Sequence, residues 1–289
     1  MKNRLEYIAF ILCSKVFQLL GLNISRKIAG FLAVVFYYLI PIRKKTVLEN
    51  LRMAFPDYSE RIVRQIALKN YKSFAIVTIE ILIMSKFTRD EINKVTHCDN
   101  SEVVLKKFNE KNGLIVLTAH FGNWEYFGAS LSSQLNLKFY MIVKPLRNPY
   151  VDKWMNNVRT KWINEVIPMG VSVRKSYQVL KDQLVLAMAG DQRGPEEGIK
   201  INFFGKLTSV YTGPAVFSLR TGAPIIYFLA IRQLDYRYKI IVHEISRENL
   251  PEHENEKITE LSRRHILFLE NYIRQYPEQW LWMHKRWKH

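Results

Sequence analysis

The segment GLIVLTAHFGNWEYFGASL, residues 113–131, contains two side chains that together could perform acid–base chemistry. An apolar run ends at His120, and Glu125 follows five residues later. On one regular helix this spacing would turn the two side chains about 140° apart. If His120 instead ends a strand and residues 123–131 form a helix, a sharp turn at Gly122 allows Glu125 to approach the imidazole. The sequence therefore predicts a strand, a turn and a helix that bring the pair together.

A carboxylate hydrogen-bonded to one imidazole nitrogen fixes the tautomer of the ring and leaves the other nitrogen free to accept a proton. No G-x-S-x-G motif and no reactive-looking cysteine accompanies His120 and Glu125, so the sequence does not indicate a nucleophile of the protein itself. The pair is therefore predicted to activate a substrate hydroxyl for group transfer onto an alcohol. The alternative is a helix-capping glutamate beside an unrelated histidine.

The composition narrows the class of protein. Hydrophobic residues make up 48% and charged residues 24% of the 289 positions, which argues against a disordered chain and against a polytopic membrane protein. The net charge of +17 favours anionic partners, namely nucleic acid, an anionic membrane surface or an acidic protein. The basic residues are scattered and form no known recognition motif, so we expect no nucleic-acid partner. Cys13 and Cys98 lack metal-ligand spacing and indicate a reducing compartment.

Two apolar runs stand at the beginning of the chain, at residues 5–22 and 28–40. Each is shorter than the roughly 20 residues that an uninterrupted transmembrane helix needs. We therefore expect residues 1–45 to form helices that lie in the membrane interface or dip into it. The alternative is a pair of buried helices in a soluble core. The basic residues 43–45 that follow favour a cytoplasmic location for the rest of the chain.

The remainder, residues 46–289, is predicted to be a single α/β domain. Residues 46–95 have the pattern of helices, with Ser59 as a cap. Beyond residue 100, short β-branched runs alternate with amphipathic segments, which predicts a layered domain with a largely parallel mixed sheet flanked by helices. The predicted strands are GLIVLTAH, FYMIVK, QLVLAMAG, PIIYFLAIRQ and KIIVHEI, and the helices are VDKWMNNVRTKWINEV, SYQVLKDQ and GPAVFSLRTG. Sites in such sheets gather at the carboxyl ends of strands, where His120 falls.

Four segments, in order, resemble one family. AHFGNWE resembles the H-x-x-x-x-(D/E) motif of glycerolipid acyltransferases. With these particular residues it looks most like the motif of the late (secondary) acyltransferases of lipid A biosynthesis, the lauroyl and myristoyl transferase family. KPLRNPYVDKWMNNVR, AGDQRGPEEGIKINFFGKLTSVYTGPAVFSLRTGAPII and YPEQWLWMHKRWK are similar to its later blocks. The resemblance implies the glycerolipid acyltransferase-like fold. It also implies acyl transfer from a thioester, on acyl carrier protein or coenzyme A as co-substrate, to a hydroxyl of a lipid A precursor, without cofactor or metal.

The resemblance also implies roles for residues. His120 would be the general base and Glu125 would orient it and balance its charge. Arg159 stands where the family has an arginine thought to contact substrate, and the alternative is a solvated helix arginine. Asp191 would end a strand at the same rim, with Arg193 close enough to pair with it, and a purely structural pair is the alternative.

Further substrate-binding candidates are Asn123, Lys144, Phe203 and Phe204. Asn123 would also cap the helix of the motif. Lys144 stands where the family commonly has an arginine, which weakens the case for bidentate phosphate binding. Phe203 and Phe204 would line the acyl groove, or else pack in the core.

The basic and aromatic end HKRWKH is expected to pack on the protein or to meet lipid phosphates at the membrane surface. Together these features predict an enzyme on the cytoplasmic face of a bacterial inner membrane, with acyl carrier protein, a lipid A precursor and anionic lipid as partners. Three alternatives stay open: the same fold acting on another glycolipid, an aryl-polyene lipid or a phosphatidylinositol mannoside; a nucleic-acid-binding protein; and a catalytically inactive scaffold.

Overall fold

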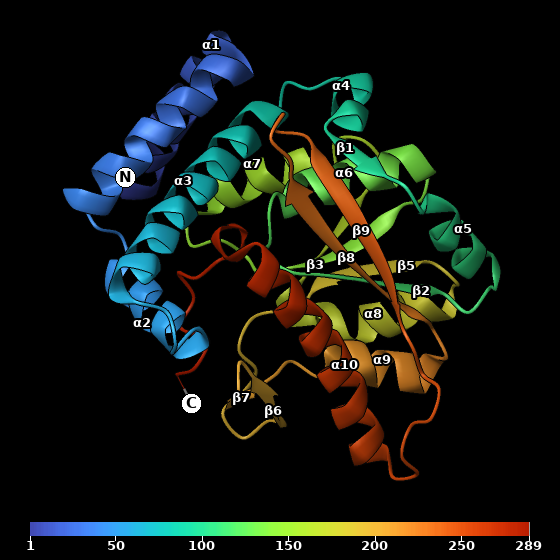
Figure 1. Cartoon of the computed structure of the whole chain (residues 1–289). Coiled ribbons are helices and arrows are strands. Elements are labelled where there is room, and N and C mark those ends of the chain that lie inside the picture. The colour runs from blue at the N-terminus through green and yellow to red at the C-terminus, as the bar shows by residue number, and fades with distance from the viewer. Residues whose placement is uncertain (289) are drawn as a thin grey trace.

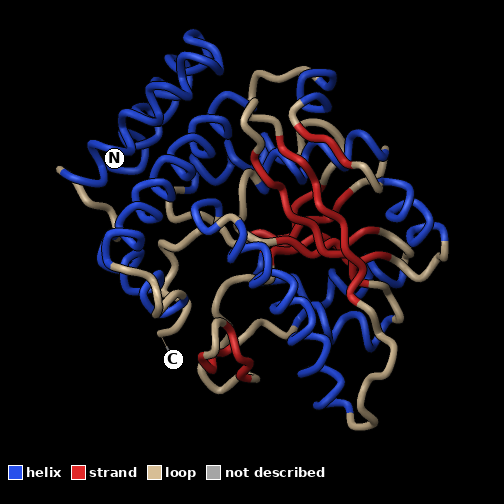
Figure 2. The backbone as a smooth tube through the Cα atoms, viewed as in Figure 1, coloured by secondary structure: helices blue, strands red, loops and turns tan. Residues whose placement is uncertain are grey.

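A mixed, mostly parallel seven-stranded sheet forms the centre of the protein (Figures 1 and 2). The computed structural model describes residues 1–288, with the backbone alone at Ser172. The strand order is β1-β9-β8-β2-β5-β3-β4, and only the β8–β9 pair is antiparallel. The strands of this sheet are β1 (Thr96–Cys98), β2 (Leu114–Thr118), β3 (Phe139–Val143), β4 (Glu165–Pro168), β5 (Val185–Ala189), β8 (Ile225–Arg232) and β9 (Tyr238–Ile245). A separate hairpin consists of β6 (Lys200–Phe203) and β7 (Lys206–Ser209).

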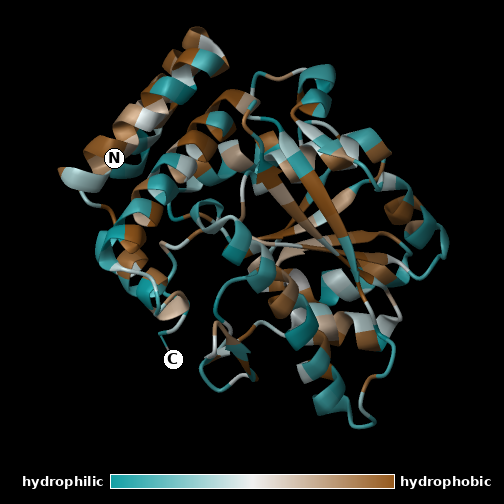
Figure 3. Cartoon of the chain, viewed as in Figure 1, coloured by the Kyte–Doolittle hydropathy of each residue, from teal (hydrophilic) through white to brown (hydrophobic). Residues whose placement is uncertain are grey.

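Helices cover both faces of the sheet. They are α1 (Lys2–Tyr38), α2 (Lys44–Ala54), α3 (Glu60–Met84), α4 (Arg89–Lys94), α5 (Ser101–Asn109), α6 (Trp124–Leu135), α7 (Pro149–Arg159), α8 (Ser172–Lys181), α9 (Gly213–Thr221) and α10 (Glu254–Gln275), with short 3-10 turns η1 (Met169–Val171) and η2 (Pro277–Gln279). Alternate residues of β2 belong to different cores, because Ile115 and Leu117 pack on one face and Leu114 and Val116 on the other. Such strands are apolar throughout, as the brown central strands of Figure 3 show.

The structure confirms the α/β class, the largely parallel sheet and all five predicted strands, which are β2, β3, β5, β8 and β9. Ser59 caps α3 as predicted, since its side chain accepts a hydrogen bond from Ile62 N. One prediction needs correction, because the helix predicted through residue 166 ends at Arg159 and β4 follows it. NFFGK ends β6, forms the turn of the hairpin and begins β7. The short β1 and β4 and this hairpin were not predicted.

The apolar start of the chain folds back on itself at Gly21. Gly21 has φ 72° and ψ 169°, which interrupts α1 although its length and composition would suffice for a membrane span. Ser25 Oγ donates a hydrogen bond to Phe17 O at 3.0 Å, a contact that an uninterrupted helix cannot make across eight residues. The two apolar runs are therefore two arms, and the second arm packs along α3.

The second arm of α1 buries one helical face against the protein, and the first arm leaves apolar side chains exposed. The buried positions of the second arm, Ser25, Ala29, Ala33 and Tyr37, recur every four residues, so they form one helical face. The first arm exposes apolar side chains at a similar spacing, namely Leu5, Ile8, Leu12, Val16 and Leu19. We call these five residues the apolar stripe. An exposed stripe of this size marks an interaction surface.

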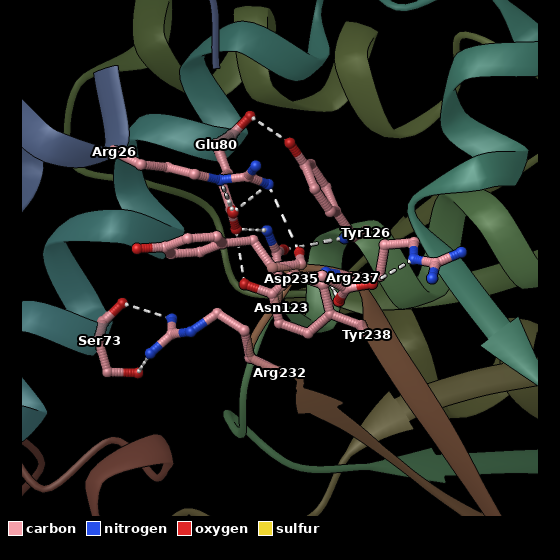
Figure 4. A network of polar contacts seen from close by, with 10 residues as sticks. Arg26, Ser73, Glu80, Asn123, Tyr126, Arg232, Asp235, Arg237 and Tyr238 are labelled. Carbon is pink, nitrogen blue, oxygen red and sulfur yellow. Dashed lines mark hydrogen bonds and ion pairs between the residues drawn. The ribbon is translucent and has the colours of Figure 1, made fainter. Parts of the chain in front are cut away.

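A buried polar network joins α1 to the segment that carries the motif (Figure 4). Glu80 of α3 is fully buried and pairs with Arg26 of α1, with Arg26 Nη2 2.7 Å from Oε1. Its other carboxylate oxygen accepts hydrogen bonds from Asn123 Nδ2 at 3.0 Å and from Tyr238 OH at 2.6 Å. Asn123 is the cap of α6, because its Oδ1 accepts from Tyr126 N. The first turn of α6 is thus held through Asn123 by the ion pair of Glu80 with Arg26 of α1.

The substitution Arg26→Met is expected to leave the Glu80 carboxylate buried without its cation. Breaking a buried ion pair from one side typically costs about 3–5 kcal/mol, so we expect a clear fall in thermal stability, measured by denaturation in detergent. The double variant Arg26→Met/Glu80→Gln should recover part of this loss. Arg52→Met, which breaks the exposed pair with Glu60, is the control and should have little effect. If Arg26→Met and Arg52→Met lowered the thermal stability equally, the buried ion pair of Arg26 and Glu80 would not have the stabilising role assigned to it.

Candidate active site

His120 lies in a tight loop directly after β2, at the carboxyl end of the sheet, as predicted. Gly122 has φ 55°, and a Cβ atom there would stand 1.7 Å from Ala230 O, so only glycine fits. The segment after α10 holds the loop from the other side: Leu281 N donates to His120 O at 3.0 Å, and Gly122 N donates to Gln279 O at 2.9 Å. The backbone of the loop is therefore fixed on both sides.

The carboxylate bonded to the imidazole is that of Asp191, which follows β5. Asp191 Oδ1 lies 2.8 Å from His120 Nδ1, and Oδ2 accepts hydrogen bonds from His120 N at 3.1 Å and from the indole of Trp280 at 3.0 Å. β2 and β5 are neighbours in the sheet, which brings the two loops together although 71 residues separate them. With a carboxylate at Nδ1, this nitrogen carries the proton and Nε2 is the free base.

Glu125 pairs with Arg159 instead of His120. The guanidinium of Arg159 contacts both carboxylate oxygens of Glu125, at 2.6 Å through Nη2 and at 3.0 and 3.2 Å through Nε. The prediction that Glu125 is hydrogen-bonded to the ring is therefore wrong in its geometry, because Nδ1 is occupied by Asp191. The planar fork of Arg159, predicted for substrate, binds this glutamate. The pair still lies close enough for both charges to act on His120.

The electrostatics of the site favour an ionised Asp191 and a basic His120. Burial lowers the pKa of His120, but the charge and hydrogen bond of Asp191, helped by the charge of Glu125, outweigh it and raise the pKa above its ordinary value. Burial raises the pKa of Asp191, but the His120 charge and the three hydrogen bonds lower it by more, so the pKa of Asp191 lies below its ordinary value. The imidazole is thus a stronger base than a free histidine.

The His120 ring borders a pocket between α3 and the segment after α10. Ser73, Phe74 and Val77 line it from α3, and Trp124 and Trp280 line it from the opposite side. His120 meets Trp124 edge-on, with ring centroids 4.9 Å apart. His120 is therefore one of the residues that line a small, largely apolar pocket.

The other predicted site residues lie in several places. Asn123 is buried, and its side chain is used to cap α6 and to bind Glu80, so it does not face the pocket. Lys144 is exposed in the loop after β3. Arg193 forms no ion pair with Asp191 among the described residues, and its Nη1 is buried without a hydrogen-bond partner. Phe203 and Phe204 are buried in the core, which favours the packing alternative.

Two residues of the site were not predicted. Trp280 supplies a hydrogen bond to Asp191, and Arg286 is fully buried close by. Arg286 thus packs on the protein, and the expectation that the cations of this segment meet lipid phosphates is wrong for Arg286. No signal in the sequence distinguished this arginine from its basic neighbours. In residues 1–288 no cluster of histidine, cysteine, aspartate and glutamate is arranged to hold a metal, and metal independence stays a prediction.

The geometry of a histidine base, a partner carboxylate and a pocket can be compared with known proteins. The family model of bacterial lipid A biosynthesis acyltransferases matches residues 3–289. The chain belongs to this family. It is 23% identical to the lipid A biosynthesis lauroyltransferase of Escherichia coli over 249 residues, which is 85% of this chain and 79% of that protein.

Other relatives of this acyltransferase extend the comparison. The lipid A biosynthesis palmitoleoyltransferase of Escherichia coli is 22% identical over the same share of both chains. A phosphatidylinositol mannoside acyltransferase of Mycobacterium tuberculosis is 25% identical over 118 residues, 39% of this chain and 37% of that protein. Family membership identifies an enzyme that transfers acyl groups to a lipid.

Replacing Asp191 by asparagine is expected to lower the pKa of His120, because it removes the charge that raises this pKa and leaves burial, which lowers it. NMR titration of labelled histidine rings measures the change, with His120 assigned from a His120→Gln spectrum. Glu125→Gln should produce a smaller fall, since its charge contributes less. A larger shift in Glu125→Gln than in Asp191→Asn would show that the partner has been misassigned.

Proposed function

We propose that this protein transfers a fatty acyl chain from an acyl thioester, carried by acyl carrier protein, to a hydroxyl group of a lipid A precursor. His120 Nε2 accepts the hydroxyl proton while the oxygen attacks the thioester carbonyl. The tetrahedral intermediate then collapses, the carbon–sulfur bond breaks, and the leaving thiolate takes the proton from the imidazolium. The observation that carries this proposal is the buried Asp191–His120 pair at the edge of a pocket, in a chain of this family.

The Glu125–Arg159 pair has a supporting part in this mechanism. A negative and a positive group beside the ring compensate each other, which allows both to be buried. The pair links α6 to α7 and so fixes the position of the first turn of α6, which follows the His120 loop. General-base assistance of this kind contributes about 10²–10⁴-fold in rate, and the alignment of hydroxyl and thioester supplies the rest.

The membrane is the proposed site of action, on the cytoplasmic face of a bacterial inner membrane. The apolar stripe of α1 presents five apolar side chains to one side. A second pocket lies at the junction of α1 and α2 and is lined by Arg43, Lys44, Lys45 and Arg52. Apolar side chains suit the acyl boundary. Cations suit anionic headgroups, and each Lys or Arg near the surface contributes about 1 kcal/mol of attraction. The net charge of +17 also suits an acidic carrier protein.

Another glycolipid acceptor is the second candidate. The mycobacterial relative that acylates a phosphatidylinositol mannoside matches 39% of the chain, against 85% for the lauroyltransferase. The greater coverage favours the lipid A precursor.

Deleting the gene in its host should remove one acyl chain from lipid A, observed by mass spectrometry. Wild-type protein should restore the chain and His120→Ala should not. With purified enzyme, acyl carrier protein thioester and lipid A precursor, His120→Ala should lower the rate by about 10²–10⁴-fold. An unchanged lipid A profile with a change in another glycolipid would favour the second candidate. Full activity of His120→Ala would rule out the mechanism.

The apolar stripe is expected to hold the enzyme on the membrane. Leu19→Glu places a charge at a side chain that is 81% exposed, and it should reduce co-flotation with phospholipid vesicles. Leu207→Glu, on the β6–β7 hairpin and 64% exposed, is the matched control and should float as the wild type does. Added salt should weaken binding to anionic vesicles only, since it screens the cations. Equal flotation of the two variants would exclude the stripe as the membrane contact.

A further inference from the structure

Arg286, near the end of the chain, is a fully buried cation that pairs with no carboxylate among residues 1–288. Its Nη1 donates to Thr208 Oγ1 at 3.0 Å and to Ser209 O at 2.8 Å, and its guanidinium lies 5.1 Å from the centre of the Phe203 ring. Its Nε and Nη2 atoms are buried and have no hydrogen-bond partner. It forms no ion pair with any described residue. Such burial of a charge is costly, so a compensating charge is expected nearby.

Two aromatic rings connect Arg286 to Asp191. Phe203, which lies against the guanidinium of Arg286, meets Trp280 with ring centroids 5.6 Å apart, and the Trp280 indole donates to Asp191 at 3.0 Å. Buried polar side chains also lie beside Asp191. His265 lies against Gly190, the residue before Asp191, since a Cβ atom on Gly190 would be 3.8 Å from His265 Cε1. The ring of Tyr227 stacks on His265, with centroids 6.2 Å apart. Tyr227 OH and both nitrogens of His265 are buried and lack hydrogen-bond partners. Burial lowers the pKa of His265 to about 3, so this ring is neutral.

Asp191 and Arg286 are buried opposite charges that are connected through Trp280 and Phe203. Burial lowers the pKa of Arg286 to about 10, which still leaves it a cation at neutral pH, and the charge of Asp191 acts on it in the opposite direction. Both charges also act on the Tyr227 hydroxyl, whose pKa burial raises well above its ordinary value. The Tyr227 hydroxyl therefore lies close enough to feel the charges of both Asp191 and Arg286.

The working enzyme needs this compensation because its base must be uncharged. When His120 is neutral, the Asp191 carboxylate has three hydrogen bonds but no cation in contact with it. The Glu125–Arg159 pair is neutral as a whole. His284 is half-buried, and burial is the chief cause of its lowered pKa; Arg193 is a further cation near these groups and is only half-buried. Of the two arginines, Arg193 and Arg286, only Arg286 is fully buried.

We propose that Arg286 is the counter-charge of Asp191 and thereby sets the pH above which His120 can act as a base. It is a positioning residue that acts through Asp191 without touching the substrate. The proposal rests on the proposed function, because it assumes that His120 is the base. Removing a cation from a coupled pair makes the pair bind its proton more tightly. Loss of Arg286 therefore raises the pKa of His120, and the acid limb of the pH–rate profile moves to higher pH.

The test compares Arg286→Met and Arg286→Gln with the wild-type full-length protein. Both variants should shift the acid limb of kcat/KM, and the NMR titration of His120, upward by about one pH unit. Arg286→Lys, which keeps a cation, should restore most of the wild-type profile. Arg232→Met removes a partly buried arginine bonded to Ser73, and it is the control that should leave the profile in place.

The double variants with Asp191→Asn separate the two ends of the connection between Asp191 and Arg286. In the Asp191→Asn background, Arg286→Met should shift the pH profile much less, because its effect passes through that carboxylate. If the Arg286 variants lose thermal stability or rate with an unmoved acid limb, the role of Arg286 is structural and the proposal is overturned. If His120→Ala is active, the proposed function fails, but the NMR titration still reports the link between Arg286 and Asp191. Should Arg286→Met not fold, Arg286→Gln, which retains amide donors, decides the question.

Discussion

The candidate active site depends on the hydrogen bonds that the Asp191 carboxylate accepts. It accepts hydrogen bonds from the His120 backbone, the His120 ring and the Trp280 indole, so one side chain joins the ends of two strands to the segment after α10. A buried carboxylate is tolerated only when donors and positive charge compensate it. Its three hydrogen bonds therefore fix the tautomer of the base and the position of the loop at the same time.

The first turn of α6 is held from two sides by buried ion pairs. Glu125 in this turn is bound by Arg159 of α7, and Asn123, its cap, is bound by Glu80 and through it by Arg26 of α1. The H-x-x-x-x-E motif thus holds two residues with different tasks. The histidine is the proposed base, and the glutamate ties α6 to α7 through Arg159.

The sequence permitted the prediction of the strands that are apolar on both faces and of His120 at a strand end, since these follow from local patterns. It did not permit the prediction of the partner of His120. Asp191 lies 71 residues away, and only the adjacency of β2 and β5 brings it to the ring. Glu125 lies close to His120 in sequence, and that proximity alone favours it as the partner. The burial of Arg286 was missed for a similar reason, because a basic and aromatic end reads the same whether it is solvated or packed into the protein. The short β1 and β4 have too few residues for a periodic signal.

The segment that completes the site is also far from the anchor in the order of synthesis. The apolar arms of α1 leave the ribosome early, whereas Trp280 and Leu281, which hold Asp191 and the His120 loop, emerge after all the strands of the sheet. Under the proposed membrane contact of α1, a nascent chain reaches the bilayer while its imidazole still lacks its full set of supports. The proposed site would then be completed only after the protein has reached the membrane.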